Sequence, residues 1–221
     1  MNFRWRLGWL LVYPIAKLIM GLRVLGREKL RQDKAKIIAA NHTSNLDPFI
    51  LGLATGQEIF FLAKEDLFNY SKWFTWLIRF WNALPLRRSA IDRGLFKTCS
   101  RLLQRNKTLI LFPEGTRSKN GNLQPFKPGI GLLAVTNSIP VVPCYIYGAR
   151  KSFISKLADQ DINKGKFRVA DIFTGRITVK FGNPIQPDGF SKNRDDYIKL
   201  TAKIRSEVEE LGSVEGFEIG R

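Results

Sequence analysis

The chain alternates continuously apolar runs with longer segments whose apolar residues recur every three to four positions. Runs such as KIIAAN (36–41) and TLILF (108–112) are typical of strands that are buried on both faces. The segment 90–107 gathers its apolar residues on one side, as an amphipathic helix does. Strands that alternate with helices predict an α/β fold, a single domain with a mostly parallel central sheet flanked by helices.

The same criteria predict the remaining elements. Pro143 lies in the middle of one expected strand and indicates a sheet edge or a bulge at that point, because proline has no N–H for a ladder hydrogen bond. The segment 149–175 has no pattern that predicts an element. Further strands are expected at 58–64, 84–88, 139–148 and 176–182, and helices at 48–56, 70–84, 128–138 and 194–212.

The N-terminal segment is apolar but short. The run 7–22 has Lys17 as its only charge and is interrupted by Pro14. As a helix it would span roughly 24 Å, less than a hydrocarbon core of about 30 Å. Trp5, Trp9 and Tyr13 would form one helical stripe, which suits the headgroup level of a bilayer.

We therefore expect residues 1–23 to be a membrane-associating helical segment that precedes one domain at 24–221. The alternative is a terminal helix that packs on the domain's own core. The other three tryptophans lie in 73–81, where a core helix and a membrane-facing helix are equally compatible with the pattern.

Two of the predicted strands end in turns that carry reactive side chains. KIIAAN leads into HTSNLD, and TLILF leads into PEGTRS. Since the carboxyl ends of parallel strands meet at one edge of a sheet, we expect both turns to open on the same edge.

The first turn contains His42, the only histidine of the chain, and Asp47 five positions later. A neutral imidazole can accept a proton from an alcohol, and a carboxylate on its other nitrogen fixes the tautomer. The alternative is an ordinary loop in which Asp47 is the N-cap of a helix and Pro48 is its first residue. The two readings of Asp47 are compatible with each other.

The second turn has the composition of a phosphate site. Thr116 and backbone N–H groups around Gly115 would donate, Arg117 would bind the oxygens, and Lys127 adds a charge before the next helix. A solvated glycine-rich turn is the alternative. Glu114 would repel a phosphate unless it accepts from a substrate hydroxyl or holds an arginine.

Arg87 and Arg88 follow the aromatic helix and would complete an anion pocket, although a solvated pair is the commoner arrangement. The net charge of +17 indicates an anionic partner, which is nucleic acid, an acidic membrane surface or a polyanionic substrate. One histidine and two distant cysteines make a zinc site improbable.

The motifs NHTSNLD, LPLRR, FPEGTRS and VVPCYIYG occur in this order, and over about residues 24–185 the chain resembles the 1-acylglycerol-3-phosphate acyltransferase family. The resemblance implies transfer of a fatty acyl group from acyl-CoA or acyl-carrier protein to the free hydroxyl of 1-acylglycerol-3-phosphate, which forms phosphatidate. It implies His42 as general base and Asp47 as its partner. It places Arg88, Glu114, Gly115, Thr116 and Arg117 in acceptor binding, and Lys127 is added from its charge and position.

The resemblance implies no metal and no bound cofactor. The expected partners are a lysophospholipid acceptor, an acyl thioester donor and an anionic membrane surface, without nucleic acid, and the expected location is the cytoplasmic face of a membrane in a monotopic arrangement. An acceptor of another kind, either a different lysophospholipid or glycerol-3-phosphate, stays open. A protein of another class, a non-catalytic lipid- or nucleic-acid-binding protein, is the more distant alternative.

Overall fold

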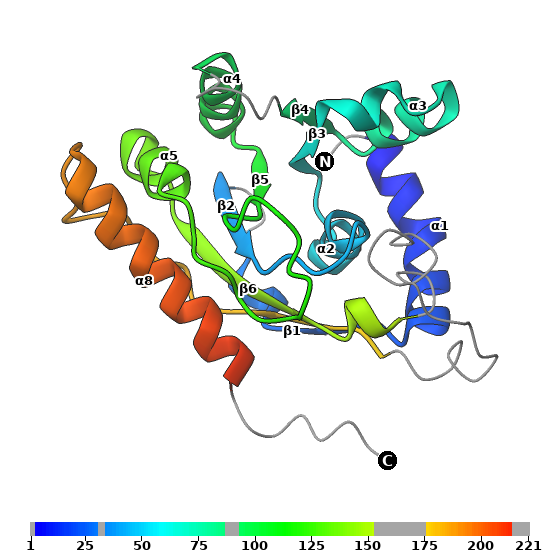
Figure 1. Ribbon diagram of the computed structural model, residues 1–221. Helices are drawn as coiled ribbons and strands as arrows, with labels where there is room; N and C mark the ends of the chain where they lie inside the picture. The colour runs from blue at the N-terminus through cyan, green and yellow to red at the C-terminus, as the bar shows by residue number, and fades with distance from the viewer. Residues whose placement is uncertain (1–2, 31–33, 87–92, 153–175, 214–221) are drawn as a thin grey trace.

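A single seven-stranded sheet organises the part of the chain that the structure describes (Figure 1). The computed structural model describes residues 3–30, 34–86, 93–152 and 176–213. The strand order is β1-β7-β6-β2-β5-β3-β4. The strands are β1 (Arg23–Leu25), β2 (Lys36–Ala40), β3 (Ile59–Lys64), β4 (Ala83–Leu86), β5 (Thr108–Leu111), β6 (Val141–Tyr147) and β7 (Thr178–Phe181).

Neighbouring strands are parallel except for β6 and β7, which pair antiparallel. β2 lies between β5 and β6, with Ile38 opposite Ile110 on one side and Val142 on the other. This topology confirms the expected α/β fold with a mostly parallel sheet. It also confirms that the turns after β2 and β5 lie at the same edge, because the two strands are parallel neighbours.

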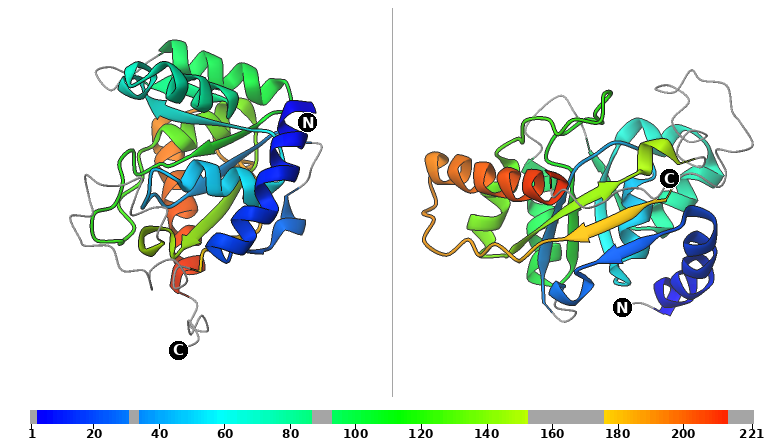
Figure 2. Two further views of the ribbon diagram at one scale, coloured as in Figure 1. Left: turned by 90° about the vertical axis from the view of Figure 1, so that its right-hand side faces the viewer. Right: turned by 90° about the horizontal axis from the view of Figure 1, so that it is seen from below.

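Helices cover both faces of the sheet (Figure 2). Alternate residues of β2 point into two separate cores: Ile38 and Ala40 pack with α1, α2 and α3, whereas Ile37 and Ala39 pack with α4, α5 and α8. The helices are α1 (Phe3–Met20), α2 (Asp47–Thr55), α3 (Lys72–Phe80), α4 (Arg93–Gln104), α5 (Gly129–Asn137) and α8 (Arg194–Ser213), with 3₁₀ turns η1 (Arg27–Lys29), η2 (Glu65–Asn69) and η3 (Ala149–Lys151).

The aromatic stripe of α1 faces the protein and not the solvent, so its expected placement at a bilayer headgroup level is wrong. Trp5 is buried and packs edge-on against Trp81, and the Trp9 indole N–H donates to the Leu53 carbonyl at 2.9 Å. Tyr13 stacks on Trp9. The opposite side of α1 is exposed and mostly apolar; its exposed large hydrophobic residues are Phe3, Leu7, Leu10, Leu11, Val12, Ile15, Leu18 and Ile19.

No helix within the described ranges has the length and apolar character needed to cross a bilayer. One side of α1 belongs to the core of the domain, and the other side is an exposed apolar surface.

The aromatic helix ends earlier than its pattern predicts. α3 stops at Phe80, and Asn82 takes the left-handed conformation with φ of 59°, so that the chain turns into β4 at Ala83. β4 is an edge strand and overlaps the strand expected at 84–88, although residues 87 and 88 lie outside the described ranges. Of α3, only Ile78 is buried, and this excludes a core helix.

Pro143 does not mark a sheet edge, because β6 has strand partners on both sides. Its carbonyl accepts from the Gly182 N–H at 2.8 Å. A Cβ on Gly182 would lie 2.7 Å from Cγ of Pro143, so the glycine leaves space for the proline ring. A residue 39 positions further along the chain thus makes proline acceptable inside the sheet.

Candidate active site

The turn after β2 is anchored by the side chain of Asn41. Its side-chain amide donates to the Ile146 carbonyl at 3.1 Å, and its side-chain oxygen accepts from the Ile146 N–H at 2.7 Å. Asn41 is buried and follows Ala40, whose partner on β6 is Cys144. These bonds extend the β2–β6 pairing by one side chain and fix the starting point of the turn that carries His42.

His42 and Asp47 form the couple that their spacing indicates. The Nδ1 atom of His42 lies 2.9 Å from Oδ2 of Asp47, whose side chain is fully buried. The same oxygen accepts from the N–H groups of Thr43 at 2.6 Å and Ser44 at 2.8 Å. These contacts make Nδ1 the protonated nitrogen of the neutral ring and leave the lone pair on Nε2.

Asp47 is the first residue of α2 and does not cap it. The N-cap position is Leu46, and no side chain caps the helix there. The carboxylate of Asp47 turns back toward the preceding N–H groups instead, so the expected N-cap role is wrong. Pro48 does lie in the first turn, where its missing N–H costs no helical hydrogen bond.

The turn after β5 holds His42 through its backbone and its ring. The His42 N–H donates to Oε1 of Glu114 at 2.7 Å, and the Ser118 N–H donates to the His42 carbonyl at 2.8 Å. The ring of Phe112 stacks on the imidazole with centroids 4.1 Å apart. Both backbone groups of His42 and one face of its ring are therefore held by residues of the second turn.

Glu114 joins two loops through its carboxylate. Oε2 accepts from the Gln124 N–H at 3.0 Å, while Oε1 accepts from His42. The side chain is buried, and burial raises the pKa of Glu114 above its ordinary value of 4.5, although the two backbone N–H groups oppose this shift. Both carboxylate oxygens thus accept hydrogen bonds from backbone N–H groups. The sequence had instead indicated a contact with a substrate hydroxyl or with an arginine.

Gly115 and Lys127 are in close contact. Gly115 has φ of 72° and closes a turn that begins at Phe112, where its N–H donates to the Phe112 carbonyl at 2.9 Å. A Cβ at Gly115 would lie 2.7 Å from Nζ of Lys127, so the lysine side chain crosses the bare face of the glycine. This contact brings an exposed ammonium group to the turn, two residues before α5 begins at Gly129.

The remaining candidates for phosphate binding are placed as follows. Thr116 is exposed, and Arg117 is half-buried with an interaction of its own within the structure. Arg88 lies outside the described residues. Among the described residues, no group of three or more His, Cys, Asp or Glu side chains is arranged to hold a metal ion.

His42 and Asp47 are predicted by the sequence, whereas the residues that hold them are not: Asn41, Phe112, Ser118 and Gln124. The first three lie in or beside the motifs NHTSNLD and FPEGTRS, so the motifs pointed to them without showing their role. Gln124 had no signal, because only its backbone N–H takes part.

Comparison with known proteins supports the same conclusion as this geometry. Residues 21–147, which are more than half of the chain, match the family model described as Acyltransferase. A 1-acyl-sn-glycerol-3-phosphate acyltransferase from Limnanthes alba is 30% identical over 216 residues, which cover 91% of this chain and 69% of that protein. A protein of the same name from Streptococcus pneumoniae is 29% identical over 185 residues, covering 81% of this chain and 61% of the relative.

The crystal structure of the 1-acyl-sn-glycerophosphate acyltransferase PlsC from Thermotoga maritima superposes with a TM-score of 0.68 and 27% sequence identity, covering 98% of this chain and 86% of that one. Sequence, fold and the His42–Asp47 couple agree: this chain is an acyltransferase and belongs to the 1-acylglycerol-3-phosphate acyltransferase family.

Proposed function

We propose that this enzyme transfers a fatty acyl group from acyl-CoA or acyl-carrier protein to the free hydroxyl of 1-acylglycerol-3-phosphate, forming phosphatidate, with His42 as general base. The observation that supports the proposal is the 2.9 Å contact between His42 Nδ1 and the buried carboxylate of Asp47. This contact leaves Nε2 to accept a proton, and the names of the relatives indicate the acceptor.

In the proposed reaction, Nε2 of His42 removes the proton of the acceptor hydroxyl while the hydroxyl oxygen attacks the thioester carbon. The tetrahedral intermediate then collapses, the carbon–sulfur bond breaks, and the departing thiolate takes the proton from the imidazolium. Asp47 stabilises that imidazolium through Nδ1. A thioester is already activated, so neither a cofactor nor an acyl-enzyme is required.

The acceptor phosphate is assigned to the turn after β5. Lys127 brings its ammonium group against Gly115, and Thr116 exposes a hydroxyl at the same turn. Arg117 is the side chain of this turn that can bind phosphate oxygens in a bidentate manner. Arg88 is retained as a fourth contact on the resemblance of its motif. Glu114 is assigned to the support of His42, since both of its oxygens accept from the backbone.

The decisive experiment is an assay of the purified enzyme in mixed micelles with labelled acyl-CoA or acyl-carrier protein as donors. Lysophosphatidate is compared with glycerol-3-phosphate and a lysophospholipid of another headgroup. We expect the highest kcat/KM with lysophosphatidate and a loss of about 10²–10⁴ in kcat for His42→Ala. Full activity of His42→Ala would exclude the base assignment, and a preference for another acceptor would exclude the substrate assignment.

We further propose that the enzyme sits on the cytoplasmic surface of the membrane in a monotopic arrangement, with the exposed face of α1 in contact with lipid. Leu11 and Leu18 on this face are 60% and 86% exposed, an arrangement typical of a helix that lies in the interface. The net charge of +17 favours the anionic cytoplasmic leaflet.

Deletion of residues 1–22 is a poor test of this arrangement, because it would also remove Trp5 and Met20 from the core. The double variant Leu11→Ser/Leu18→Ser changes the exposed side alone. We expect it to fold and to stay in the supernatant when lipid vesicles are sedimented. Sedimentation equal to that of the wild type would show that α1 is not the main lipid contact.

A further inference from the structure

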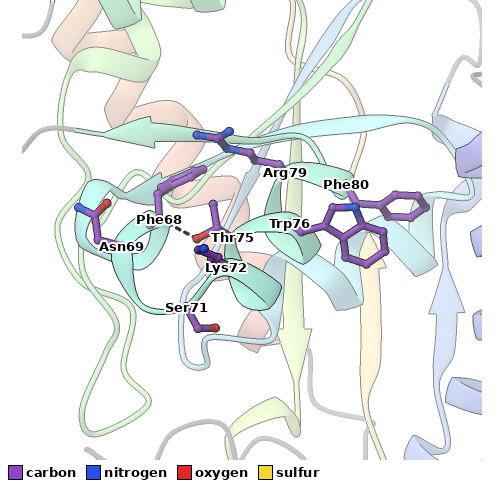
Figure 3. Close-up of a pocket in the computed structure, with 8 residues that line it drawn as sticks. All are labelled: Phe68, Asn69, Ser71, Lys72, Thr75, Trp76, Arg79 and Phe80. Carbon is purple, nitrogen blue, oxygen red and sulfur yellow. Dashed lines mark hydrogen bonds between the residues drawn. The ribbon is translucent and has the colours of Figure 1, made fainter.

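α3 and η2 enclose a surface groove that is separate from the residues placed at the catalytic site (Figure 3). Phe68 and Asn69 of η2 line one side, and Lys72, Thr75, Trp76 and Arg79 of α3 line the other. We call this the α3 groove. The Thr75 hydroxyl donates to the Phe68 carbonyl at 2.7 Å, which ties the two sides together. This bond joins η2 to α3 beside the groove.

The groove carries two exposed cations on one side of a helix. Lys72 and Arg79 are seven residues apart, about two helical turns, and Trp76 lies between them. Neither has an ion-pair or hydrogen-bond partner among the described residues. Two such groups around one hollow match the charge of a phosphate.

The aromatic residues around the groove are exposed to an unusual degree. Trp76 is 60% exposed, Trp73 is 67% exposed and Tyr70 is 80% exposed. Tryptophan and tyrosine are favoured at the boundary of a bilayer, where the ring contacts lipid and the polar tip contacts water. A groove open only to water would gain nothing from exposing these rings.

The groove is connected to the apolar face of α1 by direct contacts. Trp76 stacks on Phe80 with centroids 5.6 Å apart, and Gly8 of α1 lies against the Phe80 ring, where an added Cβ would be 3.6 Å away. Leu7, next to Gly8, is 48% exposed. From α1 to the groove, the surface therefore changes from aliphatic to aromatic to cationic side chains. In one leaflet of a bilayer, these three kinds of side chain match the acyl chains, the interface and the headgroups, in the same order.

We propose that the α3 groove binds the headgroup phosphate of an anionic phospholipid of the membrane, with Lys72 and Arg79 on the phosphate oxygens and Trp73 and Trp76 at the ester level. This proposal rests on the membrane-surface arrangement proposed above. η2 follows the carboxyl end of β3 directly, so the groove holds the membrane near the edge of the sheet on which His42 opens.

The test is sedimentation of the full chain with phosphatidylcholine vesicles, either pure or containing phosphatidylglycerol. The variant is Lys72→Gln/Arg79→Gln. The matched control is Lys97→Gln/Arg101→Gln, which removes the same charge from exposed positions of α4 on the other face of the sheet. At about 1 kcal/mol per basic residue near an anionic surface, we expect the groove variant to bind the anionic vesicles about thirty-fold more weakly.

The control is expected to lose much less affinity, and binding to pure phosphatidylcholine should be the same for all three proteins. Equal losses in both variants would attribute the effect to net charge and overturn the proposal. An unchanged groove variant, with binding still sensitive to Leu11→Ser/Leu18→Ser, would overturn the groove alone. Failure of the wild type to bind either vesicle would overturn the membrane arrangement as well.

A soluble phosphate ligand is the competing occupant, and kinetics in neutral micelles distinguish it. If Lys72→Gln/Arg79→Gln raises the KM for acyl-CoA there while leaving vesicle binding intact, the groove belongs to the donor and the lipid proposal is wrong. We expect the donor KM in neutral micelles to change by less than about twofold, since the proposed ligand is absent.

Discussion

The carboxylate of Glu114 accepts a hydrogen bond from the backbone N–H of His42 at 2.7 Å, across 72 positions of the sequence. Its second oxygen accepts from the Gln124 N–H. This carboxylate, which the motif alone assigns to substrate binding, thus connects the turn of the proposed base to the loop that precedes α5. If Glu114 positions His42, its substitution should change kcat; if Glu114 binds the acceptor, its substitution should change the acceptor KM.

Glu114→Gln should lower kcat with little effect on the acceptor KM. A carboxamide has one accepting oxygen, and its NH₂ group would face the second backbone N–H, at a cost of about 1–3 kcal/mol. Because His42 is then displaced, the kcat of the variant should fall about 10- to 100-fold. Initial rates over a range of lysophosphatidate concentrations measure both constants, with Glu209→Gln on α8 as control. A large rise in acceptor KM at unchanged kcat would instead make Glu114 a substrate ligand.

The stability of the protein should depend on pH through Glu114. Burial raises the pKa of this carboxyl above 4.5, so the folded state binds the proton more tightly than the unfolded chain does. The resulting stabilisation is complete below about 4.5 and is lost as the pH rises through the raised pKa of the folded state. The free energy of unfolding is measured in urea at several pH values for Glu114→Gln and the wild type. As the pH rises through this interval, the wild type should lose stability relative to the variant. A difference between the two proteins that stays constant with pH would contradict the expectation.

Asp47→Asn should reduce kcat by about 10²–10⁴. Its NH₂ group can present a donor to Nδ1 of His42 and stabilise the tautomer whose lone pair is on the wrong nitrogen. Asp195→Asn, an exposed change on α8, is the control. The kcat is measured with a saturating donor. If it stays within a few-fold of the wild-type value, Asp47 stabilises the turn through its backbone N–H groups and does not orient His42.

Arg117→Ala should raise the acceptor KM about 10- to 100-fold, because a charge-assisted hydrogen bond contributes about 1.5–3 kcal/mol. The donor KM should stay nearly constant. Lys119→Ala, two residues away in the same loop and exposed, is the matched control for charge. If the donor KM rises instead, Arg117 belongs to the donor site.

Gly131→Ala should destabilise the domain, whereas Gly129→Ala should not. A Cβ at Gly131 would lie 2.1 Å from the Tyr197 carbonyl oxygen of α8, while nothing lies within 4 Å of one at Gly129. Both changes improve helix propensity in α5. We expect a loss of about 1–3 kcal/mol or more in the free energy of unfolding for Gly131→Ala relative to Gly129→Ala, measured in urea. Equal stabilities would show that α5 and α8 separate easily.

Much of the fold could be predicted because its elements are encoded locally. KIIAAN and TLILF each contain four consecutive apolar residues, at 37–40 and 109–112, which indicates a strand covered on both faces, and the reactive turns follow them directly. The shared edge of the two turns then follows from parallel pairing. His42 and Asp47 could be paired for the same reason, since five residues of turn are enough to bring them together.

Contacts between distant segments decided the rest. The stripe of Trp5, Trp9 and Tyr13 was read correctly as one face of a helix, but α2 and Trp81 cover that face, so lipid does not. Pro143 is tolerated in an interior strand because Gly182 leaves room for its ring.

The α/β alternation, the two turns and the couple of His42 with Asp47 follow from local sequence patterns. The exposed face of α1 and the bond from the His42 N–H to Glu114 depend on how distant segments pack in the fold. The periodicity of a segment shows which side chains share a face, since this depends on the geometry of one helix or strand. What covers that face, or accepts from a given N–H, depends on residues that only the folded chain brings into contact.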